Sequence, residues 1–203
     1  MAEQTTVTLN SAAWRYRSSS SSYSGALRIG HQTSSGTSAG TYKSNLRFDI
    51  TSDYANFPKI VSWSLSVRTS TDSNGWNGCV ASVSHVSANT WSPTVYHTFT
   101  PTWNITETNG WHTWTTTDST DMSYLRTLFT NGAASIYIQL VRVSGCGSKI
   151  VTSGYTPYMT TIYEKGNQFY VYNSGWKEAV PYVYINGVWT KAEGAIYNGG
   201  WVS

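Results

Sequence analysis

The sequence predicts an all-β protein, a jelly-roll-like sandwich of two sheets with one short helix, followed by a small region of β-hairpin repeats. Three observations lead to this prediction. Short runs of alternating apolar and polar residues recur between clusters of glycine, proline, asparagine and serine, which is the strand-and-turn pattern. One segment has helical spacing instead, and residues 166–203 repeat an aromatic hairpin pattern.

Nine runs before residue 165 alternate in this way, and they suffice for two packed sheets. The predicted strands are residues 5–9, 26–29, 44–49, 60–68, 79–86, 95–99, 111–115, 135–143 and 158–163. Residues 18–22 and 33–41 are rich in serine, glycine and threonine, so we expect both to be surface loops.

The helix is predicted between a polar start at residues 119–121 and a stop at residues 131–132. Met122, Leu125 and Phe129 recur at helical spacing between these points. We expect this short helix to pack its apolar stripe against one end of the sandwich.

After residue 165 the chain changes character, which divides it into a sandwich domain (1–165) and a repeat region (166–203). Each of three units has a strand, a turn with Asn-Gly or Asn-Ser-Gly, and a second strand that opens with tryptophan. Because isolated hairpins are marginal in water, we expect their aromatic row to contact other chains, with a ligand-binding ladder as the alternative. The predicted interface residues are Tyr172, Trp176, Tyr184, Trp189, Tyr197 and Trp201.

The composition is that of a β-protein that works outside cells. Only 11% of residues are charged, while 10 Trp and 15 Tyr supply much of the apolar area. The net charge is +3 with basic residues scattered singly, so we expect no nucleic-acid partner. Without a secretion signal or a long apolar run, we also expect no membrane, synthesis in a host cytoplasm and release by lysis.

No catalytic residue, metal site or cofactor is predicted. The carboxylates carry no motif, whereas a glycosidase needs two that face one cleft. The histidines lack the spacing of metal ligands, and His85 shares the phase of Val83 on its strand, which places it against the core. Cys79 and Cys146 are two small thiols, which could pair only if their Cα atoms lie within about 7 Å.

Aromatic side chains are the one binding chemistry that the sequence suggests, since sugar rings stack on tryptophan. Trp76 lies in a turn-rich segment and is the first candidate for an exposed stacking residue. Trp91 and Trp103 flank a threonine-rich hairpin and are the next candidates. Three further tryptophans, in alternating strands, are expected in the core: Trp63, Trp111 and Trp114.

Five segments resemble, in order and spacing, the DNRLRE family of β-sandwich domains, which are similar to carbohydrate-binding modules. They are residues 26–30 (ALRIG), 43–50 (KSNLRFDI), 61–67 (VSWSLSV), 131–140 (NGAASIYIQL) and 156–163 (TPYMTTIY). The resemblance implies a jelly-roll-like sandwich of modular surface proteins and phage particles, without a catalytic site. The early loops of this sequence are poor in acidic residues, and they therefore depart from the calcium-binding pattern of some such modules.

The repeat region resembles the Tyr-Val-Tyr-x-Asn-Gly-x-Trp-Lys-x-Ala tails of phage and prophage structural proteins of Gram-positive bacteria. It therefore implies a virion location, as a tail or head fibre or decoration, with other virion proteins as partners. We expect a homo-oligomer, for which a trimer is a suitable symmetry, and a host-surface glycan as ligand. The alternatives are a free-standing carbohydrate-binding module acting on cell wall and, less favoured, a glycan-cleaving enzyme.

Overall fold

The computed structural model describes residues 4–18, 21–23, 27–30, 42–51, 54, 57, 59–70, 78–106, 109–164, 169–172, 176–179, 182–185, 188–191, 196–197 and 201–202. Up to residue 164, this part of the chain holds eleven strands and one helix. The strands are β1 (Gln4–Asn10), β2 (Ala13–Ser18), β3 (Ser21–Tyr23), β4 (Leu27–Gly30), β5 (Tyr42–Asp49), β6 (Lys59–Ser70), β7 (Gly78–Val86), β8 (Val95–Ile105), β9 (Gly110–Thr116), β10 (Ser135–Ile150) and β11 (Tyr158–Glu164); the helix is α1 (Ser119–Thr130).

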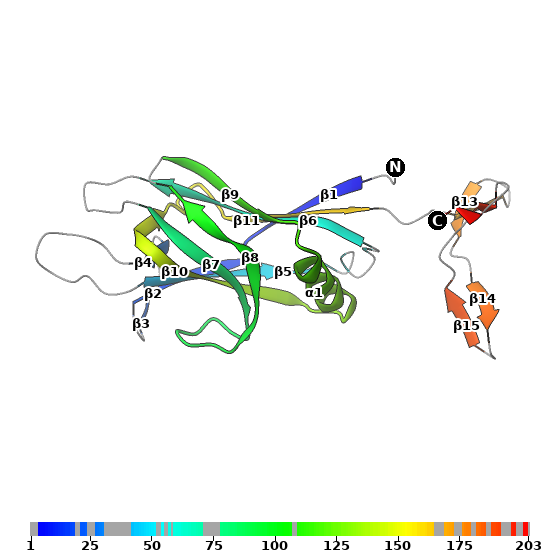
Figure 1. Ribbon diagram of the computed structural model, residues 1–203, viewed down its shortest axis with the longest axis horizontal. Coiled ribbons are helices and arrows are strands. Elements are labelled where there is room, and N and C mark those ends of the chain that lie inside the picture. Colours follow the sequence, from blue (N-terminus) through cyan, green and yellow to red (C-terminus); the bar gives the residue numbers. More distant parts are fainter. Residues whose placement is uncertain are drawn as a thin grey trace, which may run out of the picture.

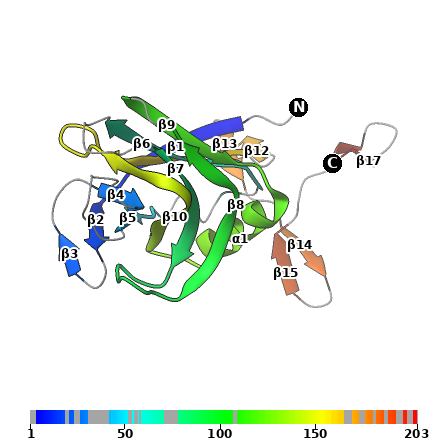
Figure 2. The same ribbon diagram turned by 60° about the vertical axis from the view of Figure 1, so that its left-hand side comes forward.

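The strands form one antiparallel sheet that curls into two facing layers (Figures 1 and 2). The first layer has the order β9-β6-β11-β1, and the second has the order β8-β7-β10-β5-β2-β3. The last residues of β10 pair with both β4 and the end of β6, which joins the layers. The predicted all-β, sandwich-like fold with one helix is confirmed.

Aromatic side chains fill much of the space between the layers. Trp63 is fully buried and contacts Phe99 at a centroid distance of 4.8 Å and Trp114 at 5.6 Å. Such edge-on and tilted contacts are the favoured geometries for aromatic pairs. Leu65 and Ile138, from opposite layers, are fully buried in the same core. The buried area of aromatic rings in the core thus compensates for the low aliphatic content of the sequence.

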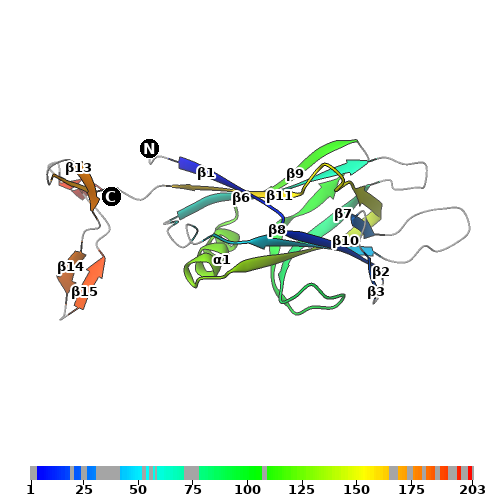
Figure 3. The same ribbon diagram turned by 180° about the vertical axis from the view of Figure 1, so that it is seen from behind.

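Helix α1 closes one end of the sandwich, between the two layers (Figures 1 and 3). Asp118 caps its first turn by accepting hydrogen bonds from the backbone amides of Thr120 and Asp121. Met122, Leu125 and Phe129 are buried along one face, so the predicted apolar stripe is confirmed. Within the described part of the chain, no helix is long and apolar enough to cross a membrane.

All nine predicted strands are present, but β2 and β3 were not predicted. The expectation of a loop at residues 18–22 is wrong, because β2 runs to Ser18 and pairs with β3, with Ser18 opposite Ser21. Trp14 and Tyr16 alternate inward from β2 and pack against the core. Residues 33–41, also expected to be a loop, lie outside the described residues.

Strand β11 lies between β1 and β6 and is hydrogen-bonded on both sides from Tyr158 to Glu164. The repeat region that follows forms three hairpins, as predicted. They pair β12 (Phe169–Tyr172) with β13 (Trp176–Ala179), β14 (Tyr182–Ile185) with β15 (Val188–Lys191), and β16 (Ile196–Tyr197) with β17 (Trp201–Val202). Each hairpin is a separate two-stranded sheet.

Candidate functional site

An exposed cluster of rings lies at one end of the outer face of the first layer. We call Trp111, Tyr155, Tyr158 and the adjoining Arg68 the aromatic patch. Trp111 is 45% exposed and Tyr155 is 38% exposed. The Trp111 ring meets Tyr158 at 5.2 Å and the edge of Tyr155 at 6.3 Å between centroids. The rings therefore hold one another in place while part of their surface faces water.

The patch follows from strand register. Trp114 points into the core, and successive side chains of a strand alternate between faces, so Trp111 three positions earlier points outward. Arg68 of β6 is the direct partner of Trp111, and Tyr158 of β11 is the partner of Ser66. Three neighbouring strands thus bring these side chains to the same end of one face.

Tyr155 comes from the turn between β10 and β11. Its backbone amide donates to the carbonyl of Thr152 at 3.2 Å, which closes the turn. The turn is tied to β6 because the amide of Val151 donates to the carbonyl of Arg68 at 2.8 Å. The guanidinium carbon of Arg68 then lies 3.6 Å from the centroid of the Tyr155 ring, a cation–π contact.

Next to the patch, the same face carries paired hydroxyls. Hydroxyl oxygens lie 2.8 Å apart in Ser66 and Thr113, and 2.9 Å apart in Ser64 and Thr115. Across β1 and β11, those of Thr8 and Thr160 lie 3.1 Å apart. A hydroxyl pair uses one O–H for its mutual bond, so the second O–H of each pair can donate to another group.

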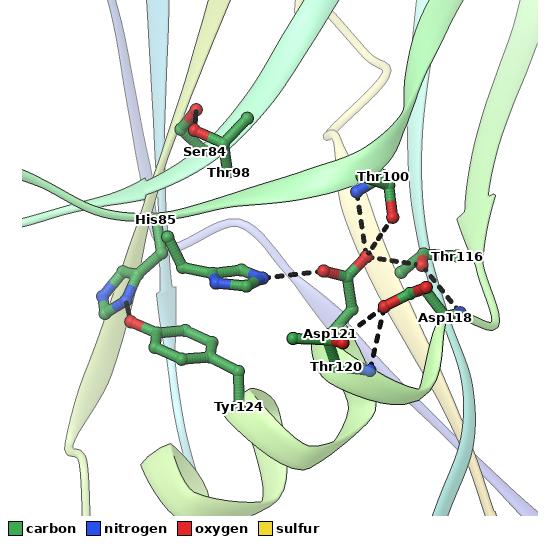
Figure 4. Close-up of polar contacts among 10 residues, drawn as sticks. Ser84, His85, Thr98, Thr100, Thr116, Asp118, Thr120, Asp121 and Tyr124 are labelled. Carbon is green, nitrogen blue, oxygen red and sulfur yellow. Dashed lines mark hydrogen bonds and ion pairs between the residues drawn. The ribbon is translucent and has the colours of Figure 1, made fainter.

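A second cluster joins helix α1 to the second layer and to β9, and Figure 4 shows its polar contacts. The Asp121 carboxylate, only 2% exposed, accepts a 2.7 Å contact from Nε2 of His97 and a 2.9 Å bond from the amide of Thr100. His97 contacts Oδ1, whereas the Thr100 amide and the hydroxyls of Thr100 and Thr116 all donate to Oδ2. Burial raises the pKa of Asp121, but these hydrogen bonds outweigh it, so the pKa lies below its ordinary value.

The cluster extends through stacked and bonded rings to β7. The His97 ring stacks on Tyr124 at 4.2 Å with 12° between planes. The Tyr124 hydroxyl contacts Nδ1 of His85, which is buried as its strand phase predicts. His97 and Tyr124 also line an open hollow with hydroxyl side chains of α1. Because all its contacts bind α1 to strands, we interpret this cluster as a structural joint.

The three tryptophans predicted to bind ligand fall in different environments. Trp76 lies outside the described residues. Trp91 is half-buried, with Nζ of Lys43 at 4.4 Å from its ring centroid and donating to its carbonyl. Trp103 is 3% exposed and belongs to the core, so its prediction as an exposed stacking residue is wrong. The expectation that Trp111 is a core residue is also wrong, because Trp111 is 45% exposed.

Trp91 is held in residues 87–94, the connection between β7 and β8, which folds back over the second layer. Gln139 donates to Oδ1 of Asn45 at 3.0 Å, and Asn45 donates to Oδ1 of Asn89 at 2.9 Å. The guanidinium of Arg17 donates to the carbonyl of Asn89. Side chains of β2, β5 and β10 thus hold this connection against the second layer. We therefore interpret Trp91 as a residue that packs against the sheet.

In the repeat region, each tyrosine that was predicted for the interface is the strand partner of the predicted tryptophan in its hairpin. Tyr172 is opposite Trp176, Tyr184 opposite Trp189, and Tyr197 opposite Trp201. Their roles in contacts with other chains stay predictions.

Cysteine and metal chemistry can be placed only in part. Cys79 and Cys146 are both free thiols, and burial raises the pKa of Cys79, whose Sγ lies 3.6 Å from the Ser148 hydroxyl. Among the residues that the structure describes, no three His, Cys, Asp or Glu side chains gather as a metal site.

No protein-family model matches the chain, and no curated protein matches it.

Proposed function

We propose that this chain is a non-catalytic component of a bacteriophage particle that binds a host-surface glycan through the aromatic patch. The observation that carries the proposal is the exposure of Trp111, 45% of whose surface faces solvent on an otherwise hydroxyl-rich sheet face. A large exposed ring in a rigid, polar setting is a typical feature of binding surfaces.

Sugar recognition suits this chemistry for two reasons. The C–H face of a pyranose is apolar and stacks on an indole ring, whereas its hydroxyls need polar partners nearby. The patch offers the ring of Trp111, and the adjoining exposed Thr113, whose hydroxyl is bonded to that of buried Ser66, offers a hydrogen-bonding group. Contacts with Tyr155 and Tyr158 restrain the Trp111 ring before any ligand arrives, which reduces the entropy lost on binding.

The particle location rests on the repeat region. Its sequence resembles the tails of phage structural proteins, and in each of its three hairpins a tyrosine and a tryptophan are direct strand partners. Short ribbons of this kind gain stability by packing on other surfaces, including copies of the same chain. A homo-oligomer, of which a trimer is one form, would attach the sandwich to other virion proteins and leave the aromatic patch outward.

The alternatives differ from this proposal in measurable ways. A free-standing carbohydrate-binding module would use the same patch but would neither copurify with particles nor depend on the repeat region. A glycan-cleaving enzyme would need two carboxylates on a cleft, and Asp121 has both of its oxygens engaged in the helix joint.

The first test is binding of the full chain to an array of bacterial cell-wall glycans. We expect Trp111→Ala to weaken binding about tenfold or more, since the stacking ring is lost. Tyr96→Ala is the matched control, because Tyr96 is 58% exposed on β8, a strand of the other layer. Equal binding by all three proteins, or loss of binding in the control alone, would rule out the aromatic patch as the site.

The second test concerns the particle. Antibody against the chain should label purified virions of a phage that encodes it, and the label should be retained through density-gradient purification. Presence only in the lysate supernatant would favour the free-standing module.

A further inference from the structure

We propose that the aromatic patch recognises an acidic sugar, whose ring stacks on Trp111 while its carboxylate pairs with the guanidinium of Arg68. The ligand class is a uronic-acid-containing glycan. This inference rests on the proposed function, because it concerns the same site, and it adds the charge of the ligand and the residue that reads it.

Arg68 is oriented by contacts that leave its hydrogen-bonding edge available. Its guanidinium lies over the face of Tyr155, with 3.6 Å from the guanidinium carbon to the ring centroid. A guanidinium donates within its own plane, so stacking on a ring occupies its face and not its N–H groups. Within the part of the chain that the structure describes, this stacking contact holds the Arg68 cation in place without using its N–H donors.

The positive charge of Arg68 lacks a carboxylate partner within the described part of the chain. The ion pairs found there join Arg47 with Asp49, Lys59 with Glu164, and His97 with Asp121. The first two show that basic side chains on the sheet surface can have acidic neighbours. Arg68, beside the exposed ring of Trp111, has none in these pairs, which gives the patch a positive charge complementary to an anion.

Distance favours a carboxylate carried on the stacked ring itself. Arg68 and Trp111 are direct strand partners, so their Cβ atoms are about 5 Å apart. A uronic acid carries its carboxylate directly on the pyranose ring, and this group would extend from the Trp111 ring toward Arg68. A planar carboxylate also accepts the two parallel N–H bonds that a guanidinium donates, which a lysine could not supply.

The test measures binding of short galacturonate, mannuronate and glucuronate oligomers, each beside its methyl ester, to the full chain by calorimetry. Esterification removes the charge but keeps the sugar ring. We expect at least one acid to bind about tenfold more tightly than its ester, and the difference to shrink as salt is raised.

Variants then assign the effect to Arg68. Arg68→Gln should weaken binding of the acid about tenfold and leave binding of the ester within about twofold. Arg68→Lys keeps the charge without the fork and should fall between the two. Arg126→Gln is the matched control, because it removes the same charge from an exposed position on α1. A thermal melt of each variant confirms that the sandwich is folded.

The outcomes separate this inference from the proposed function. Equal binding of acid and ester, both abolished by Trp111→Ala, would overturn the acidic ligand but keep a glycan site. Tighter binding of a polyol-phosphate polymer than of any uronate, or equal losses in Arg68→Gln and Arg126→Gln, would also overturn it. If no glycan, acidic or neutral, depends on Trp111, both proposals fail.

Discussion

The Tyr124 hydroxyl lies 2.5 Å from Nδ1 of His85, where helix α1 meets strand β7. Burial, with a smaller contribution from the neighbouring His97, lowers the pKa of His85 to about 4. His85 is thus neutral at pH 7, and in the tautomer that leaves Nδ1 without a hydrogen, this nitrogen accepts a hydrogen bond from the Tyr124 hydroxyl. The opposite ring nitrogen then carries the hydrogen.

This pKa predicts a loss of stability in mild acid. The folded state holds His85 neutral down to about pH 4, whereas the unfolded chain protonates it below its ordinary pKa of 6.5. Because the unfolded state binds more protons between these values, the free energy of unfolding falls as the pH drops through that window, by on the order of 3 kcal/mol. Urea denaturation at several pH values measures this fall.

His85→Gln should make the free energy of unfolding less dependent on pH in this window, since glutamine does not titrate. His112→Gln should retain this dependence. A slope that survives in His85→Gln would assign the pH dependence to another group. Below about pH 4, Asp121 adds a second loss of stability. Its pKa in the folded state is lowered, so the ionised carboxylate stabilises the fold, and this contribution is lost as the carboxylate becomes protonated.

Trp103→Ala and Trp111→Ala should differ in stability. Trp103 is 3% exposed in the core, and truncating a buried tryptophan costs about 3–5 kcal/mol. Trp111 is 45% exposed, and its truncation should cost about 1 kcal/mol or less. Chemical denaturation of both variants checks this order, and equal losses would contradict the outward position of Trp111.

A chain truncated after Lys165 should fold by itself. The sheet through β11 closes without any strand of the repeat region, which forms separate two-stranded sheets. We expect a cooperative melt within about 3 °C of that of the full chain. An insoluble or non-cooperative product would show that the hairpins complete the sandwich core.

Trp189→Ala should reduce assembly without unfolding the sandwich. Trp189 is the strand partner of Tyr184 in its hairpin, so the change removes one of two aromatic residues at this register position. We expect a lower mass by light scattering, or reduced incorporation into particles, with an unchanged sandwich melt. If the wild-type protein and this variant are both monomeric and incorporate equally, the repeat aromatics serve a ligand instead.

Chelation with EDTA should leave the melting temperature unchanged, because the sequence has no cluster with metal-ligand spacing. Differential scanning fluorimetry with and without EDTA, followed by added calcium, measures this. A fall of several degrees that calcium reverses would contradict the prediction.

The alternation of apolar and polar residues predicts the strands well, but the predicted positions of Trp103 and Trp111 are wrong. Trp111 and Trp114 are three positions apart and so face opposite sides of β9, while Trp103 shares the phase of Phe99 on β8. Strict counting along the predicted strand 111–115 places Trp111 and Trp114, whereas Trp103 lies beyond the predicted strand 95–99 and beyond a register shift in β8. By contrast, β2 ends in arginine and serine, and the guanidinium of buried Arg17 donates to the distant carbonyl of Asn89, a contact that sequence patterns do not contain.

The position of β11 also has a mechanical meaning. The repeat region leaves the sandwich at the end of this strand, which is hydrogen-bonded to β1 on one side and to β6 on the other from Tyr158 to Glu164. Ladder hydrogen bonds run perpendicular to the strands, so a pull along β11 loads both rows in shear at once and does not open them one by one. A sandwich anchored by its tail to a particle and by its ligand to a cell would carry tension along a strand that is hydrogen-bonded on both edges.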